Sequence, residues 1–287
     1  MSVVPNPGIG PGAVVRNAAV GADLGDFNVY DADDWAAVKT LAEGGTLVDD
    51  DVIVDTTNDG RWRVDATSGL VIPASVLGRD VALDTVDRIV EEDPADTTMT
   101  VVEGAGGGLV DWDTTVADRV AILGGTSAAS TVESANERPL DADIYGGIVC
   151  ITGLKIADLS AGTTGLDIRW EDGAGGQRGF DLRGHSSFHA TDWIISGSTN
   201  TTLTGLDVAT ERDFVVVWDE SGTTTYNCWV YADGAVVATL AAERHLPSVD
   251  SATAFSTGAS KTFRLVAATA ATPPTLSFKR FLGGYFE

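Results

Sequence analysis

Lysine, cysteine and histidine are scarce in this sequence, and long apolar runs are missing. Lysine occurs only at Lys39, Lys155, Lys261 and Lys279, so arginine supplies most of the 18 positive charges. Nucleic acids and anionic membrane surfaces attract basic proteins, so the composition argues against both kinds of partner. The sequence has no run of about 18 apolar residues, so we expect no membrane insertion.

The cysteine content argues against a disulfide scaffold and a structural zinc site. Only Cys150 and Cys228 occur, without the Cys and His spacing of such a zinc site. Both lie in alternating apolar segments, which predicts two buried thiols. The alternative, a disulfide between adjacent strands, requires Cα atoms within about 7 Å. The first residues, MSVVPNPGIGPGAVV, lack the charged start and apolar core of a signal peptide, so we expect no general secretory export.

Negative charge is abundant. The chain has 42 acidic and 18 basic residues, a formal net charge of -24 and a pI near 4.2. A surface rich in acid and poor in lysine stays hydrated in concentrated salt, where screening mutes self-repulsion. We interpret the chain as salt-adapted; an acidic mesophilic protein is the alternative. Hydrophobic residues make up 44%, enough for a substantial core.

The pattern of the first hundred residues predicts three segments. Residues 1–24 are rich in Pro, Gly and Ala and indicate an extended arm. Residues 25–68 predict a small α+β module with a short amphipathic helix, N-capped by Asp31, and a hairpin that turns at Asn58-Asp59-Gly60. Residues 69–103 form a connector, in which VALDTVDRIVEED could be a strand or a short helix.

Residues 104–287 follow an almost pure two-residue period. In GLDIRWEDG, for example, Leu166 and Ile168 alternate with Asp167 and Arg169, which indicates a half-solvated antiparallel strand. Many short strands, separated by turns and without helical crossovers, predict two antiparallel sheets packed face to face. The expected fold is therefore mainly β, with the small α+β module followed by a jelly-roll β-sandwich.

Two stretches of the second half resemble a known fold. FVVVWDESGTTTYNCWVYADGAVVATL is similar to the late strands of concanavalin- and laminin-G-like jelly rolls, and GIVCITGLKIADLSAGTTGLDIRWEDG to their early strands. The resemblance rests on the strand pattern over residues 104–287 and has no diagnostic motif. It implies a sandwich of this type and the surface recognition of glycans.

The N-terminal stretch resembles a different class of protein. LAEGGTLVDDDVIVDTTNDGRWRVDATSGLVIPASVLGRD is similar to short modules in tail, baseplate and spike proteins of tailed viruses, and the salt-adapted composition suggests a virus of halophilic archaea. The resemblance implies a virion component that assembles in the host cytoplasm and becomes extracellular with the particle. It also implies a homo-oligomer, with a trimer favoured and other symmetries open, whose arm and module contact other virion proteins.

The best polar cluster lies in RGHSSFHATDW. If this stretch is a strand, His185 and His189 share one face, with Asp192 and Trp193 beside them, where they could hydrogen-bond a sugar. Solvated histidines are the simpler interpretation. A transition-metal site needs a third ligand and an outer shell, neither of which is visible, so we predict no metal.

A second group of residues has the chemistry of sugar binding. Trp229 and Tyr231 alternate with Tyr226, Cys228 and Val230, so one face of this strand belongs to the core and the other presents aromatic rings. With Trp193 and Asp233, these rings could stack on a sugar and accept its hydroxyl donors. The alternative is that they pack in the core or across strands.

No catalytic group is identifiable. The glycine-rich segments lack the Gly-Lys-Ser/Thr of a phosphate-binding loop, and acidic residues occur everywhere, so paired carboxylates are uninformative. We therefore expect no enzyme and no cofactor, but a virion protein that attaches to a host glycan or glycoprotein. The alternatives are a purely structural turret, decoration or baseplate subunit, and a glycan-active enzyme or cellular surface lectin.

Overall fold

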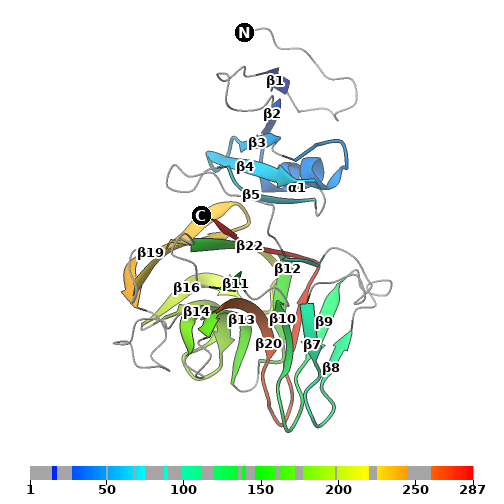
Figure 1. Cartoon of the computed structure of the whole chain (residues 1–287), viewed down its shortest axis with the longest axis vertical. Coiled ribbons are helices and arrows are strands. Elements are labelled where there is room, and N and C mark those ends of the chain that lie inside the picture. Colours follow the sequence, from blue (N-terminus) through cyan, green and yellow to red (C-terminus); the bar gives the residue numbers. More distant parts are fainter. Residues whose placement is uncertain are drawn as a thin grey trace.

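The computed structural model of the chain consists of a small module above a larger β-sandwich (Figure 1). It describes residues 15–17, 28–49, 51–66, 69–74, 87–89, 99–111, 119–134, 138–139, 146–159, 162–171, 177–197, 199–219, 225–244 and 260–286. In these residues the chain is mostly β, in mainly antiparallel sheets with one short N-terminal helix, as the sequence predicts.

In the described part of the chain, the module consists of a five-stranded sheet and a helix. Its order is β1 (Val15–Asn17), β2 (Asn28–Ala32), β3 (Val52–Asp55), β4 (Gly60–Asp65) and β5 (Leu70–Pro73). The helix α1 (Trp35–Glu43) connects β2 to β3, which are parallel, while the other pairs are antiparallel. β1 lies within the predicted arm and β5 within the predicted connector, so both ends of the module sheet extend past the predicted 25–68.

The helix begins three residues later than predicted. The N-cap is Asp34, whose Oδ1 accepts a hydrogen bond from the Ala37 amide at 2.9 Å. The predicted cap, Asp31, is wrong because it still belongs to β2, which pairs with β3 up to Ala32. In the described part of the chain, no helix has the length and hydropathy of a membrane span.

The first sandwich sheet has eight strands among the described residues. Its order is β16 (Asn200–Asp207), β15 (His189–Ser196), β14 (Gln177–His185), β13 (Thr163–Glu171), β20 (Ser260–Ala267), β10 (Ser130–Ser134) and β7 (Met99–Val102), with β11 (Arg138–Pro139) also on β20. All of these pairs are antiparallel. We call it the distal sheet, because it lies on the side of the sandwich away from the module.

Among the residues that the structure describes, the second sandwich sheet has nine strands, and it lies next to the module. Its order is β19 (Ala235–Arg244), β18 (Thr225–Ala232), β17 (Arg212–Asp219), β12 (Gly146–Ala157), β21 (Thr275–Phe278), β9 (Val120–Leu123) and β8 (Leu109–Asp111). β22 (Arg280–Phe286) pairs with β12 and with β6 (Asp87–Ile89), so the segment left open by the sequence contributes a strand. We call it the proximal sheet; β12 contacts β5 of the module, and β22 lies just beneath the module (Figure 1).

The two sandwich sheets enclose one core, as the two-residue period predicts. On β17, Phe214, Val216 and Trp218 point into this core and are at most 1% exposed. On β14 the same holds for Phe180 and Leu182. Side chains of alternating residues point to opposite faces of a strand, so the remaining residues of these strands face outward.

The cysteines are two buried free thiols, as predicted. Cys228 on β18 lies in the sandwich core, whereas Cys150 on β12 faces the opposite side of the same sheet, towards the module. β17 lies between the two strands. Burial raises the pKa of both thiols, so they stay protonated and unreactive in the folded protein.

Candidate functional site

The module is fixed to the outer face of the proximal sheet by a second hydrophobic core. The module contributes Trp35, Val38 and Trp62 among others. From the sandwich come residues that alternate with those of its own core and so face outward: Ile148 and Cys150 on β12, Val215 and Val217 on β17, and Leu282 on β22. Each of these is at most 2% exposed. We call this contact, with the polar groups around it, the junction.

Aromatic rings continue the junction towards the β18–β19 hairpin. The ring centroids of Trp35 and Trp62 lie 4.9 Å apart, and those of Trp62 and Tyr231 lie 5.4 Å apart, both in edge-to-face geometry. The hairpin turn fits against Trp35 because it contains Gly234, where a Cβ would lie 2.8 Å from the ring. Gly234 also has a φ of +84°, which favours glycine.

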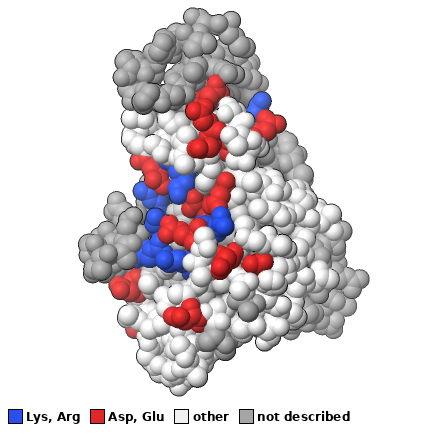
Figure 2. All heavy atoms as spheres, turned by 180° about the vertical axis from the view of Figure 1, so that it is seen from behind, with Lys and Arg blue, Asp and Glu red and all other residues white. Residues whose placement is uncertain are grey.

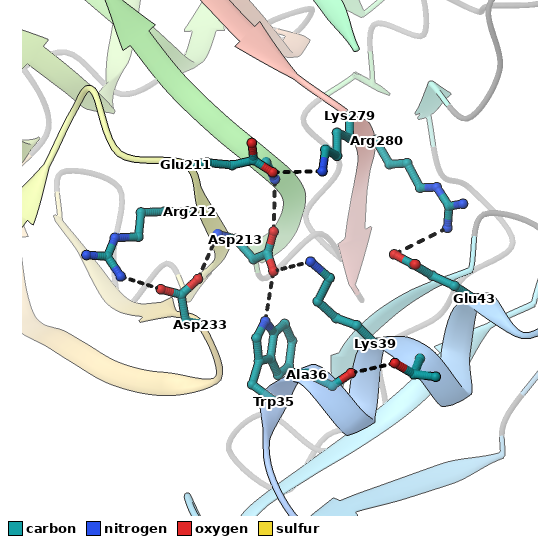
Figure 3. A network of polar contacts seen from close by, with 12 residues as sticks. Trp35, Ala36, Lys39, Glu43, Glu211, Arg212, Asp213, Asp233, Lys279 and Arg280 are labelled. Atoms are coloured by element: carbon teal, nitrogen blue, oxygen red, sulfur yellow. Dashed lines mark hydrogen bonds and ion pairs between the residues drawn. The ribbon is translucent and has the colours of Figure 1, made fainter. Parts of the chain in front are cut away.

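One buried carboxylate joins the two parts of the molecule. Asp213, at the start of β17, is 8% exposed. Its Oδ2 accepts a hydrogen bond from Trp35 Nε1 at 2.9 Å and lies 2.8 Å from Lys39 Nζ, while its Oδ1 accepts from the Gly153 amide at 2.9 Å (Figure 3). Two donors from the helix and one from the sandwich therefore converge on one side chain.

The effect of this pairing is visible in the pKa of Lys39. Burial lowers that pKa, but the hydrogen bond to Asp213 and its negative charge outweigh burial, so the pKa lies above its ordinary value. Lys39 therefore stays charged at neutral pH. A buried carboxylate is costly unless it is paired and hydrogen-bonded, and Asp213 meets both conditions only while the module is docked.

Further ion pairs surround Asp213. Lys279 Nζ lies 2.8 Å from Glu211 Oε1, and Arg119 pairs with the other carboxylate oxygen of Glu211. Burial raises the pKa of Glu211, but these two cations lower it to below its ordinary value. Arg280 pairs with Glu43 of the helix at 3.7 Å. Charges of both signs mingle in the middle of one face of the molecule (Figure 2).

Three of the seven predicted ligand-binding residues lie at the junction. Trp229 and Tyr231 pack against the module core, and burial raises the pKa of Tyr231. Asp233 occupies the β18–β19 turn, where its Oδ2 accepts from Arg212 at 2.7 Å and its Oδ1 from the Asp213 amide at 3.0 Å. The aromatic face of β18 is therefore partly covered by the module, and these side chains contribute to the junction.

A fourth predicted residue, Trp193, lies in the sandwich core. Its side chain is 0% exposed, and its ring contacts Phe214 at a centroid distance of 5.2 Å. A ring without exposed surface has no face to offer a sugar. Trp193 therefore does not lie beside His185 and Asp192 as predicted, because it points to the opposite face of β15.

The outer face of the distal sheet carries a row of polar side chains. In register, Arg264 lies opposite Asp167, Asp167 opposite Asp181, and Asp181 opposite Ser196. Arg264 pairs with Asp167 and Arg183 with Asp181, each at 3.0 Å. Both aspartates are 3% exposed, so the prediction that Asp167 is solvated is wrong. The first pair joins β20 to β13; the second lies within β14, where Arg183 also donates to Thr163 of β13 and to Ser196 of β15.

The other three predicted residues meet at one end of this face. The stretch is a hairpin and not a single strand: His185 ends β14, residues 186–188 form the turn, and His189 begins β15 directly opposite His185. With Asp192 and the turn residue Phe188 they form what we call the β14–β15 tip. Phe188 is 61% exposed, and its ring lies 4.5 Å from that of His185.

Hydrogen bonds indicate which nitrogen of each neutral imidazole carries the proton. His185 Nδ1 accepts from the Ser187 amide and His189 Nδ1 from the Asp192 amide, each at 3.1 Å. A neutral imidazole has one donor and one acceptor nitrogen, so in both rings the proton belongs on Nε2. In this tautomer the Nδ1 lone pair of each ring accepts a backbone amide. Among the described residues, no group of three or more His, Cys, Asp or Glu side chains could hold a metal ion.

The sequence analysis missed Phe188 and the polar centre of the junction. A lone aromatic residue between Ser186-Ser187 and His189 breaks the two-residue period, and that break was the available signal for an exposed ring. Asp213 and Trp35 are 178 residues apart, and no local pattern indicates their contact.

Comparisons with known proteins find similarity in structure only. Neither a protein-family model nor a curated protein sequence matches the chain. The solved structures that resemble it include legume lectin-like jelly-roll sandwiches. Lectin I from Ulex europaeus, in complex with the methyl glycoside of α-L-fucose, has a TM-score of 0.47 and 8% identity, over 71% of this chain and 99% of that one.

Two further structures show the same level of likeness. Lectin II from Ulex europaeus has a TM-score of 0.46 and 11% identity, over 72% of this chain and 100% of that one. A carbohydrate esterase from the Shiga toxin-encoding bacteriophage phi24B has a TM-score of 0.43 and 13% identity, also over 72% and 100%. Likenesses of this size concern the fold and carry no argument about function.

We predict that Asp213→Ala undocks the module. The change leaves Lys39, Trp35 Nε1 and the Gly153 amide without their acceptor, at a cost of about 3 kcal/mol. Cys150, beneath the module, should then react with a maleimide under native conditions, while Cys228 stays protected in the sandwich core. Peptide mass spectrometry measures both thiols in one sample.

Asp192→Ala is the matched control, because this aspartate also accepts a backbone amide hydrogen bond but lies on the distal sheet. It should leave both thiols protected. Protection of Cys150 in the Asp213→Ala protein would contradict the role of Asp213, and equal labelling of both thiols would show that the whole chain unfolds.

Proposed function

We propose that the protein is a non-catalytic glycan-recognition component of a salt-adapted virus particle. In this proposal the module and the arm hold the chain on the particle, and the distal sheet recognises a glycan or glycoprotein of the host surface. The observation that carries the proposal is the division of the two outer faces of the sandwich: the module covers the proximal face, and the β14–β15 tip lies on the distal face.

The chemistry of the tip suits a sugar. Phe188 offers an exposed apolar ring for the C–H face of a pyranose. The Nε2–H groups of His185 and His189 can donate to hydroxyl oxygens, and the Asp192 carboxylate can accept from hydroxyl groups. One exposed ring and three polar side chains offer few contacts, so single sites would bind weakly, and many copies on one particle would raise avidity by about 10² to 10⁴.

The placement on a virion is supported by the sequence. The net charge of -24 suits a molecule that is exposed to concentrated salt. The N-terminal stretch resembles modules of tailed-virus spike and baseplate proteins, and the junction fixes that module to the sandwich. A rigid connection keeps the recognition face pointing away from the anchored end.

We expect Phe188→Ser to weaken glycan binding by about tenfold, because the exposed ring supplies most of the apolar contact. Binding is measured in molar KCl on immobilised oligosaccharides and on the purified host surface glycoprotein. Leu109→Ser is the matched control, since Leu109 is also exposed, at 47%, but lies on β8. Absence of binding by the wild type, or equal loss in both variants, would refute recognition at the tip. Turnover with release of acetate or reducing ends would indicate an enzyme.

A mass-spectrometric census of purified particles tests the placement on a virion. We expect the chain to be present in stoichiometric amounts, and its absence would refute this part of the proposal. Presence on the particle without glycan binding would favour the purely structural alternative, a turret, decoration or baseplate subunit.

A further inference from the structure

The His185 imidazole closes the turn of the β14–β15 tip. Its Nδ1 accepts the Ser187 amide hydrogen bond at 3.1 Å, and its backbone carbonyl accepts the Phe188 amide at 3.1 Å. Side chains that accept a nearby backbone N–H stabilise turns in this way. The turn therefore depends on a lone pair on Nδ1, which only the neutral ring with its proton on Nε2 provides.

The same imidazole positions the exposed ring of the tip. The planes of His185 and Phe188 meet at 68°, in edge-to-face contact. Phe188 is otherwise 61% exposed, so few neighbouring contacts restrain it. A rotation of the imidazole would therefore displace Phe188.

The surroundings of His185 disfavour its charged form. Arg183, on the same strand and face, is the charged group that acts on it among the described residues. Across the sheet, the residue opposite on β13 is the uncharged Thr163, and the residue opposite on β15 is His189. The Asp192 carboxylate lies 3.9 Å from His189 Nε2, so its partner is the His189 ring and not the His185 ring. Burial, followed by Arg183, lowers the pKa of His185.

We propose that protonation of His185 opens the β14–β15 tip, so that the glycan binding proposed above, on which this regulatory role rests, is released on acidification. A proton from solvent adds to the Nδ1 lone pair, and the ring then presents an N–H to the Ser187 N–H. The hydrogen bond is lost, and the imidazolium turns away from both Ser187 and Arg183. Phe188 loses its support.

The direction of the pH dependence follows from linkage. The pKa of His185 is lower in the closed tip than in an open chain, where it is about 6.5. The closed tip therefore binds fewer protons than the open one. Its stability is complete above about pH 6.5 and is lost as the pH falls towards the lowered pKa.

The first test needs no ligand. In the wild type, the Ser187 amide should be protected from hydrogen exchange at pH 7.5, and at pH 5 its protection, corrected for the intrinsic rate, should fall about tenfold or more. In His185→Asn the amide Oδ1 replaces Nδ1 as acceptor without titrating, so Ser187 should stay protected at both pH values. In His185→Gln the acceptor is displaced, so Ser187 should exchange rapidly at both.

The matched control is His189→Asn, which should leave the pH transition of Ser187 unchanged. Protection of Ser187 in the wild type at pH 5, with His185 shown by its Hε1 chemical shift to be protonated, would overturn the proposal. So would a transition that persists in a His185→Asn protein whose Ser187 is protected at pH 7.5. If Ser187 is unprotected in that variant at pH 7.5, the pH dependence of Ser187 protection in the wild type alone decides whether the proposal holds.

The second test connects the switch to binding. Wild-type glycan affinity should fall about tenfold between pH 7.5 and pH 5, and that of His185→Asn should change little. The two proposals fail differently. A Ser187 transition without glycan binding at any pH would refute the proposed function and leave the switch intact, whereas binding that is equal at both pH values would refute release on acidification.

Discussion

The burial of one apolar sheet face beneath the module is the constraint on which the rest of the structure depends. Residues of β12, β17 and β22 that alternate with the sandwich core would be exposed without the module. An exposed apolar face of this kind favours association, and its burial is worth about 25 cal/mol per Å². Asp213 helps to fix the orientation of the module on this face, because its carboxylate needs the helix donors Trp35 and Lys39.

This constraint also decides which surfaces remain for recognition. Beneath the module, Trp229, Tyr231 and Asp233 contact groups of the junction and are only partly exposed to solvent. The distal face carries neutralised Asp and Arg pairs and ends in the β14–β15 tip. The proposed function therefore places anchoring and recognition on opposite sides of the sandwich.

The sequence predicted the sandwich because the two-residue period directly reflects which side chains enter its core. Tyr226, Cys228 and Val230 are buried there as predicted. The period cannot tell solvent from a second layer, however. From the sequence, the other face of β18 could contact a ligand or pack against other residues, and that of β13 is expected to face water. The cap at Asp34 was missed by three residues, because several acids precede the helix and each could serve as a cap. The junction depends on contacts between distant residues, which no local pattern reveals.

Module and sandwich share a hydrophobic core and should therefore unfold as one body. Scanning calorimetry of the full chain in molar KCl tests this most directly. A shared core predicts one endotherm whose calorimetric and van't Hoff enthalpies agree. Two separate endotherms, one of them with the small enthalpy of a module that unfolds alone, would contradict it.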